Sequence, residues 1–313
     1  MPWSTKMRAM NTITLVVTAA FLWPSPSVGR AQANKHTLTC APEKTIGQAI
    51  KTLKPGDTLL VSGTCNENVD IGEEVHGITL DGDGTAIING DSSVSTFTVT
   101  GRGITIRGFT IVGGLQGIAV LDGGSAVIDG NTIQSAASNG ITVFRNSTAQ
   151  IINNTIQNNP SSGIQLQNSS SARIGFTGPP SNRVSMPNTI QNNGAPGIQV
   201  LRGSSGQIFT NTIQNNGSHG VSVDRNAQAE IAACTITGNA GDGIRGMRNA
   251  GVDIGTDATG ATPQFEDDTN TGSNGGFGVR CTIDGFVDGR LGTLTGTLGG
   301  KDFAEGCIDS VLQ

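Results

Sequence analysis

A unit of 23 residues recurs along the chain, and this repetition constrains the fold more than any other feature of the sequence. The ungapped copies are residues 125–147, 148–170, 205–227 and 228–250. Shorter or interrupted copies of the frame are residues 103–124, residues 171–204 with an 11-residue insertion, and residues 251 to about 285 with an acidic insertion. Units of this size are supersecondary elements that bury their apolar faces by stacking on their neighbours.

Apolar residues alternate with polar ones inside each unit, which predicts short strands with one buried face. Three isoleucine-rich columns recur at fixed positions: Ile128, Ile151, Ile174, Ile208, Ile231 and Ile254; Ile133, Ile156, Ile190, Ile213 and Ile236; Ile118, Ile141, Ile164, Ile198, Val221 and Ile244. Helical repeats would instead need apolar residues at a spacing of 3.6. Three strands per unit, each followed by a turn, predict a parallel β-helix whose coils stack about 4.8 Å apart.

Stacking of equal positions also predicts two polar columns. Asn131, Asn154, Asn188 and Asn211 are expected to point inward at a turn and to hydrogen-bond to one another and to buried backbone. The threonines that follow them are expected to face outward. We interpret that row as ordinary strand packing rather than as an ice-binding or ligand-binding face, because it reads Thr-Ile-Gln and not Thr-x-Thr.

The pattern Gly-Ile-x-Val followed by Asn-Thr-Ile-Gln-Asn-Asn resembles the repeat of the right-handed parallel β-helix proteins, the pectin-lyase-like superfamily. The resemblance covers about residues 37–290 and implies an all-β, single-stranded right-handed parallel β-helix with 22–23 residues per coil. Residues 45–53 also resemble the start of such proteins. There, Ile46, Ala49, Ile50 and Leu53 share one helical face, which predicts a short helix that caps the N-terminal end of the core.

The N-terminal 33 residues have the features of a secretory signal peptide. Lys6 and Arg8 precede a short apolar segment, and Ala31-Gln32-Ala33 is a small-residue cleavage signal. We therefore expect residues 1–33 to be removed and residues 34–313 to form one domain, with an N-terminal cap at 34–57 and a C-terminal cap at 286–313. The expected location is secreted or periplasmic, without a membrane span after cleavage, and the expected state is a monomer.

Cleavage would also change the charge and the aromatic content of the chain. The first 33 residues contain three of the 19 basic residues and none of the 24 acidic ones, so the mature chain would carry a net charge near −8. Such a chain lacks the basic surface that nucleic acid requires. It would also contain no Trp and no Tyr, so recognition of a ligand must be mainly polar.

The cysteines follow the length of one coil. Cys40 and Cys65 are 25 residues apart, and Cys281 and Cys307 are 26 apart. Residues one coil apart lie within disulfide range, so both pairs are predicted to be oxidised. Cys234 stands where neighbouring coils have asparagine and is predicted to be a buried free thiol.

The resemblance implies lyases, hydrolases or epimerases that act on acidic polysaccharides, but it completes no catalytic signature. Only Ser218-His219-Gly220 echoes a motif of these enzymes, and the paired aspartates that accompany it are absent. Whether the protein is an enzyme therefore stays open.

One cluster of candidate catalytic residues arises from the register. His219 and Asp242 occupy the same position in successive coils, and Arg245 follows on the next strand, above Ser222. We expect His219, Asp242 and Arg245 to lie on the surface, where Asp242 raises the pKa of His219 and Arg245 binds a sugar carboxylate. Ser222 is a candidate ligand-binding residue beside them.

A second candidate is a column of arginines at one turn: Arg145, Arg202, Arg225 and Arg248. Stacked arginines could follow an anionic chain, or they could simply suit a solvated turn, with Asp224 offsetting part of the charge. No metal cluster or other cofactor is expected, except that Asp81-Gly-Asp83-Gly and Glu266-Asp267-Asp268 could each hold calcium.

These observations lead to two functional hypotheses. The first is an exported β-helix protein that binds, and in its enzymatic form processes, an acidic polysaccharide or cell-envelope glycan on its outer face. The alternative is a non-catalytic cell-surface or envelope scaffold. A groove lined by acidic residues would favour the first, and a smooth surface would favour the second.

Overall fold

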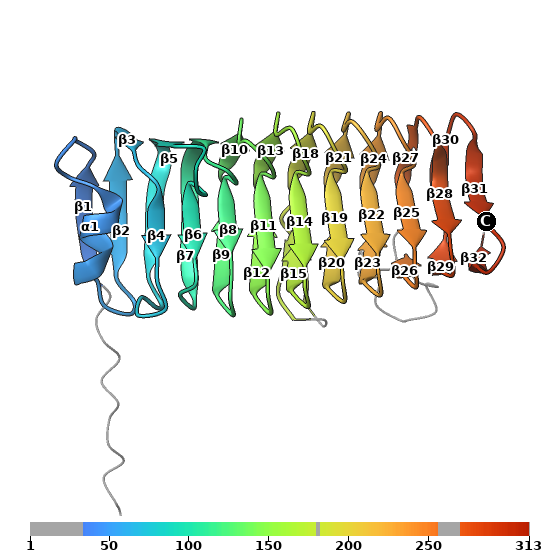
Figure 1. The fold of residues 1–313 in the computed structure, drawn as a ribbon, viewed down its shortest axis with the longest axis horizontal. Helices are drawn as coiled ribbons and strands as arrows, with labels where there is room; N and C mark the ends of the chain where they lie inside the picture. The colour runs from blue at the N-terminus through green and yellow to red at the C-terminus, as the bar shows by residue number, and fades with distance from the viewer. Residues whose placement is uncertain (1–33, 180–181, 256–269, 313) are drawn as a thin grey trace, which may run out of the picture. The chain divides into compact units, whose positions relative to one another are not determined.

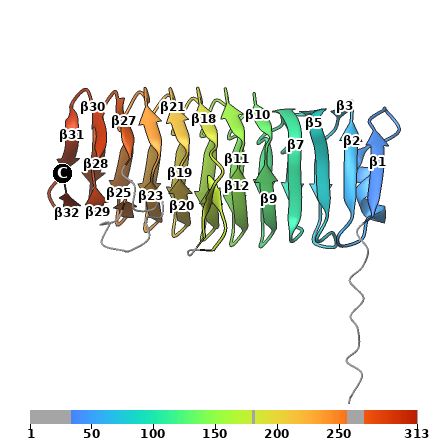
Figure 2. The same cartoon turned by 180° about the vertical axis from the view of Figure 1, so that it is seen from behind.

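The computed structural model describes residues 34–179, 182–255 and 270–312, which form a stack of coils built from short parallel strands. Figures 1 and 2 show the coils side by side in chain order, from the blue N-terminal end to the red C-terminal end. Each repeat contributes three strands, and equal strands of successive coils pair in parallel to form three long faces. The predicted all-β parallel β-helix is therefore confirmed.

We call these faces A, B and C in the order in which each coil visits them. Face A contains β1 (Lys35–Thr39), β2 (Thr58–Ser62), β9 (Ser125–Asp129), β12 (Thr148–Ile152), β15 (Ser171–Ile174), β20 (Ser205–Phe209), β23 (Gln228–Ala232), β26 (Gly251–Ile254), β29 (Phe286–Arg290) and β32 (Ile308–Leu312). Face B contains β3 (Thr64–Asn66), β10 (Thr132–Gln134), β13 (Thr155–Gln157), β18 (Thr189–Gln191), β21 (Thr212–Gln214), β24 (Thr235–Thr237), β27 (Thr271–Asn274) and β30 (Thr293–Gly296). Two longer strands, β5 (Thr79–Gly90) and β7 (Ile104–Gly113), run through faces A and B.

Face C is a separate sheet of ten strands. It contains β4 (Val69–Ile71), β6 (Phe97–Val99), β8 (Ile118–Val120), β11 (Ile141–Phe144), β14 (Ile164–Gln167), β19 (Ile198–Leu201), β22 (Val221–Asp224), β25 (Ile244–Met247), β28 (Phe277–Thr282) and β31 (Gly299–Phe303).

The register follows the predicted columns. Ile151 pairs with Ile128 on one side and with Ile174 on the other, and all three side chains are fully buried. The corresponding residues of faces B and C pair in the same way. One apolar core therefore runs through the interior of the stack, because each alternate side chain of every strand points into it.

Asparagines complete the core at the turns. In the predicted ladder, Oδ1 of Asn154 accepts hydrogen bonds from the backbone N–H and Nδ2 of Asn131, at 2.9 and 3.1 Å. Asn154 in turn donates from its backbone to Asn188. A second ladder, which the sequence analysis did not identify, lies at the turn between faces B and C and consists of Asn159, Asn193, Asn216, Asn239 and Asn274.

Cys234 interrupts the first ladder, as predicted, and is a buried free cysteine. Burial raises the pKa of its thiol to about 12, so the group is inert at neutral pH. Its sulfur faces the backbone N–H of Asn211, and its own N–H donates to Oδ1 of Asn270 at 3.1 Å. Sulfur is a weak acceptor, so the hydrogen bond at this turn is weaker than the bond that an asparagine oxygen accepts in the neighbouring coils.

We therefore expect Cys234→Asn to raise the free energy of unfolding by about 1 kcal/mol, because an amide oxygen replaces sulfur opposite Asn211. Cys234→Ala removes the acceptor and should lower the free energy of unfolding by about 1–2 kcal/mol. Urea denaturation of both variants measures the difference. An asparagine variant less stable than the alanine variant would contradict the proposed fit of an amide in this slot.

The predicted short capping helix is confirmed. A single turn of helix, α1 (Ile46–Ala49), continues into a 3-10 turn (Ile50–Thr52), and Ile46 and Ile50 are buried against the first coils. Thr45 caps the helix by accepting the Gln48 N–H, and the Glu67 carboxylate accepts the N–H groups of Ile46 and Gly47 at 2.7 and 3.1 Å. These bonds satisfy donors that a helix start leaves free.

Both predicted disulfides are present. The Cα atoms of Cys40 and Cys65 are 5.1 Å apart, and those of Cys281 and Cys307 are 6.1 Å apart. Residues 286–312 continue the three faces through β29, β30, β31 and β32. The predicted signal peptide at 1–33 lies outside the described residues. Within the ranges described above, no helix is long and apolar enough to cross a bilayer.

The predicted insertion between residues 171 and 204 begins after β15. It contains a small antiparallel pair, β16 (Phe176–Thr177) and β17 (Val184–Ser185). Phe176 packs on Phe209 at the end of β20, with ring centroids 4.7 Å apart, and Ala232 completes this cluster outside the main core. The insertion is thus fixed to the outside of the stack beside face A.

Candidate functional site

A groove runs along the outer surface of face A. One part, of about 520 Å³, crosses β9, β12, β15 and β20, and a second, of about 440 Å³, crosses β20, β23, β26 and β29. Ser205 and Gln207 line both parts, so the two hollows are continuous. Seven strands at roughly 4.8 Å spacing give the groove a length of about 29 Å, which is enough for several sugar units.

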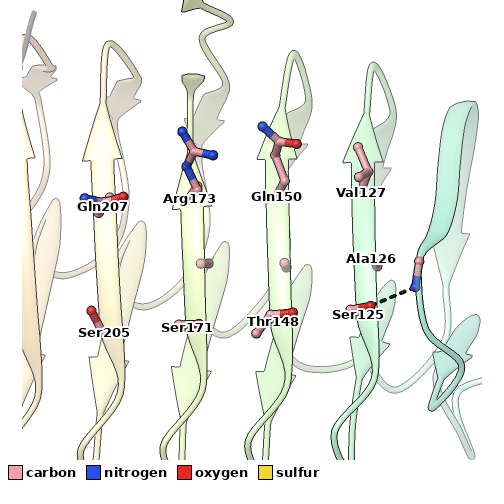
Figure 3. Close-up of a pocket in the computed structure, with 12 residues that line it drawn as sticks. Ser125, Ala126, Val127, Thr148, Gln150, Ser171, Arg173, Ser205 and Gln207 are labelled. Carbon is pink, nitrogen blue, oxygen red and sulfur yellow. Dashed lines mark hydrogen bonds between the residues drawn. The ribbon is translucent and has the colours of Figure 1, made fainter. Parts of the chain in front are cut away.

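Two rows of side chains form the floor (Figure 3). In the first part of the groove, the first row consists of short side chains that carry hydroxyl groups: Ser125, Thr148, Ser171 and Ser205. The second row is longer and changes in charge from coil to coil: Val127, Gln150, Arg173, Gln207, Glu230, Asp253 and Asp288. Short side chains beside long ones leave the surface hollow along the first row.

Arg173 is the cation of the groove floor. Its register neighbours are Gln150 and Gln207. Its guanidinium donates to the carbonyl of Gly178 in the insertion, and it lies 4.6 Å from the centroid of the Phe176 ring. The insertion therefore holds this half-buried guanidinium in place, which lowers the entropic cost of binding a ligand with it.

Three carboxylates occupy the C-terminal part of the groove. Glu230, Asp253 and Asp288 are directly opposite one another on β23, β26 and β29. Burial, together with the charges of Glu230 and Asp288, raises the pKa of Asp253 to about 6. Nε2 of Gln207 donates to Glu230 at 3.0 Å and so joins this acidic part to the Arg173 part.

The raised pKa predicts a pH-dependent stability. The folded state binds the Asp253 proton more tightly than the unfolded state does, so the free energy of unfolding falls as the pH rises from about 4 to about 6 and then levels off. Asp253→Asn should remove this slope and stabilise the protein at pH 7 by about 1 kcal/mol. The full shift corresponds to about 3 kcal/mol, but solvent screens a half-exposed carboxylate. Urea denaturation between pH 4 and pH 7 tests this, and an unchanged slope in the variant would contradict it.

The structure brings the predicted cluster together on face C. Nδ1 of His219 lies 3.3 Å from Oδ2 of Asp242, and Nε2 lies 3.0 Å from the guanidinium of Arg245. The other oxygen of Asp242 accepts the Phe277 N–H at 2.9 Å. Ser222 is directly opposite Arg245 in the register, as predicted.

One expectation about this cluster was wrong, and a second holds only in part, because Asp242 does raise the pKa of His219 but other effects outweigh it. His219, Asp242 and Arg245 are not all on the surface: the Asp242 side chain is 4% exposed, the His219 side chain is 15% exposed, and Ser222 is buried. The pKa of His219 is lowered, because burial outweighs the opposing effect of Asp242, and Arg245 and Arg280 lower it further. His219 is therefore neutral at neutral pH.

The arginine column lies at a turn with left-handed backbone. Arg145, Arg202, Arg225 and Arg248 have φ between 52° and 57°. Arg248 forms a two-point ion pair with the buried Asp224, and Arg145 lies 3.1 Å from Asp122. The charges of these two are thus balanced, whereas Arg202 and Arg225 are exposed on neighbouring coils.

Two segments were candidate calcium sites, and the structure describes only the one at Asp81. Asp81 pairs with Arg107 at 2.7 Å and accepts the Asp83 N–H, so this carboxylate is already used in the fold. Residues 266–268 lie outside the described residues. In the part of the chain that the structure describes, the one group with metal-ligand spacing is Cys40, Cys65 and Glu67, whose cysteines form a disulfide.

With this geometry established, comparison with known proteins assigns the family. The family model described as "Right handed beta helix region" matches residues 58–179 and 97–264, which is more than half of the chain. The chain belongs to the right-handed β-helix family. This agrees with the resemblance of the repeat and with its predicted hand.

A search among individual proteins found a relative that matches only part of this β-helix protein. A cell surface glycoprotein of Methanothermus fervidus is 30% identical over 135 residues, which is 42% of this chain and 22% of that protein. The chain therefore spans about a fifth of the length of this relative.

Solved structures support the fold of the β-helix protein. The pectate lyase Pel9A superposes with a TM-score of 0.56 at 12% identity and covers 89% of this chain and 80% of its own. The A-module of the mannuronan C-5 epimerase AlgE6 of Azotobacter vinelandii gives 0.54 at 14% identity, with 89% of both chains covered. An alginate lyase of Paenibacillus gives 0.51 at 16% identity, with 89% and 99% covered. At these identities the likeness shows the fold alone.

The sequence analysis did not identify the groove residues. Their row contains Gln150, Arg173, Gln207, Glu230 and Asp253, so no single residue type recurs from coil to coil to mark a column. The row could have been located from its fixed position in the repeat, because each of its members lies one residue before a core isoleucine of face A. Reading the charges along that position would have found both the cation and the acidic part.

Proposed function

We propose that this protein binds an acidic polysaccharide, or an acidic cell-envelope glycan, along the groove of face A outside the cytoplasm. The observation that supports this most is the continuous groove with a braced guanidinium in its floor. A carboxylate of the glycan would bind Arg173 in a two-point contact, and Gln150 and Gln207 would bind neighbouring hydroxyls. Hydroxyl and amide side chains suit a sugar chain in a groove without Trp or Tyr.

The acidic part of the groove limits where the carboxylates of a bound glycan can lie. An anionic sugar over Glu230 and Asp253 would be repelled while both are ionised, so the carboxylates of the glycan belong near Arg173. Protonation of Asp253 reduces the repulsion, and binding should therefore strengthen as the pH falls below about 6. Glu230 and Asp253 are two carboxyl groups with different surroundings, and such a pair is what general acid–base catalysis uses. The assay therefore measures cleavage or conversion of the polymer as well as binding.

The test is binding and turnover of polygalacturonate and alginate, with dextran as a neutral control. Arg173→Ala should weaken binding of the acidic polymers at least tenfold and leave dextran unaffected. Arg202→Ala removes an equally charged, exposed residue at a turn and should change little. Loss of binding in Arg202→Ala alone would move the site to the arginine column. Equal binding by the wild type and both variants would contradict the groove.

A surface scaffold is the second candidate function. The match to a cell surface glycoprotein favours it, and so does face B, where Gln134, Gln157, Gln191 and Gln214 form a ladder of side-chain amides at 2.8–3.0 Å. Such a face is satisfied by its own hydrogen bonds and stiffens the stack. If no polymer binds under any condition above, the scaffold becomes the better proposal.

A further inference from the structure

Two arginines are placed against each other on face C. Arg245 of β25 is directly opposite Arg280 of β28 in the parallel register. Like charges directly opposite each other destabilise a sheet unless something balances them. Arg280 has a partner on its other side, because its Nε lies 3.0 Å from Oδ2 of Asp302, close enough for an ion pair but not aligned as a hydrogen bond.

Arg245 lacks a comparable carboxylate. Its other register neighbour is Ser222, and its guanidinium faces Nε2 of His219. That ring is neutral at neutral pH, because burial and the two arginines lower its pKa. Within the described part of the chain, the Nε of Arg245 is buried and has no hydrogen-bond partner.

The nearest acid, Asp242, does not pair with either arginine. Asp242 is buried, and its two oxygens contact Nδ1 of His219 and the Phe277 N–H. The Asp242 backbone N–H donates to Nδ1 of His219 at 2.9 Å and so fixes the ring. Among the described residues, only the Arg280 guanidinium is therefore in direct contact with a carboxylate, and Arg280 is 37% exposed to solvent.

We infer that Arg245 and Arg280, with His219 beside them, bind an oxyanion, either a carboxylate or a sulfate group, on face C. Guanidinium groups recognise both anions through paired N–H donors, and the anion would remove the repulsion between the arginines. Phe277, whose ring lies 5.5 Å from the Arg280 guanidinium, stacks on that residue and restricts it. This site is on a different face from the groove and does not depend on the proposed function.

His219 couples this site to pH. Protonation of the ring adds a positive charge next to the bound anion, and Asp242 on the other side of the ring favours the protonated form, whereas Arg245 and Arg280 oppose it. A bound anion offsets the effect of both arginines. Anion binding should therefore take up a proton and should become tighter as the pH falls below the usual pKa range of histidine.

The experiment uses the full chain with sodium sulfate and D-glucuronate as probes at constant ionic strength. Calorimetry measures affinity and proton uptake at pH 5.5 and 7.5, and the imidazole NMR signals of His36, His76 and His219 are followed in the same titrations. We expect the His219 signal alone to shift and its pKa to rise with the anion. The tighter of the two probes identifies the anion as a sulfate or a carboxylate group.

Variants separate this site from the groove. Arg245→Gln and Arg280→Gln should each weaken binding about tenfold or more, and His219→Gln should retain binding but lose its pH dependence. Arg173→Ala, in the groove, should have no effect on these probes. Circular dichroism confirms folding of each variant. Unchanged affinity in a folded Arg245→Gln variant, or a His219 signal that ignores both probes, would overturn the inference.

Discussion

Replacing Asn154 by alanine is expected to lower the free energy of unfolding by about 3–5 kcal/mol. The side chain accepts from Asn131 and donates to the carbonyls of Ile128 and Ile152, both at 2.8 Å, and it is 1% exposed. Alanine leaves the Asn131 N–H without this acceptor and removes one donor from each carbonyl, although the Ile152 carbonyl keeps the Gly130 N–H at 3.1 Å. Each buried group left unpaired costs about 1–3 kcal/mol. Water cannot replace the amide in a slot enclosed by the coils above and below.

Asn182→Ala is the matched control, because Asn182 is exposed in the insertion and its recorded contact there is a backbone bond to Pro179. It should change stability by no more than about 0.5 kcal/mol. Urea denaturation of both variants gives the comparison. Equal destabilisation by the two substitutions would show that the ladder does not contribute as described.

Gly163→Ala should destabilise the protein by about 2–3 kcal/mol through overpacking. This glycine precedes Ile164 of β14 and belongs to the glycine column at the start of face C. A Cβ atom there would lie 2.5 Å from Cγ2 of Ile190 and 2.7 Å from the carbonyl oxygen of Gly197 in the next coil. Its φ is not in the left-handed region, so the cost is steric and not conformational.

Gly251→Ala provides the contrast. At that position the nearest atom to an added Cβ is Cγ of Gln228, at 3.6 Å, and the backbone is compatible with alanine. We expect a gain of about 0.4–1 kcal/mol, because alanine restricts the unfolded chain. Thermal unfolding of both variants should move the melting temperature in opposite directions. A drop of similar size in both would rule out the close coil contact at Gly163 as the cause.

The repeat determines most of the fold, because identical residues at a fixed interval define the register. Ile128, Asn154 and the two disulfides could be placed from spacing alone, since each depends only on which residues lie one coil apart. The second asparagine ladder has an equally regular signal in the sequence, because Asn-Asn pairs follow Thr-Ile-Gln in three of the coils. Its members, such as Asn193, fill the turn between faces B and C.

The functional sites were predicted less well, because their properties depend on how deeply each side chain is buried and on which segments contact it. The position of a residue in the repeat does not determine either. The register correctly brought His219 and Asp242 together. It did not show that these side chains would be buried and that burial would reverse the expected pKa shift of His219. Arg173 presents the same difficulty, because its orientation is set by Gly178 and Phe176 of the insertion, whose path has no repeat to predict it.

The insertion after β15 joins the stack through a narrow neck. The Met186 N–H donates to the Gly175 carbonyl at 2.8 Å, and the Asn153 N–H donates to the Met186 carbonyl at 3.2 Å, so the chain leaves and re-enters at nearly the same point. The loop could therefore be lengthened, shortened or exchanged without disturbing the layers on either side. A change in this loop would therefore alter the setting of Arg173 and leave the stack itself intact.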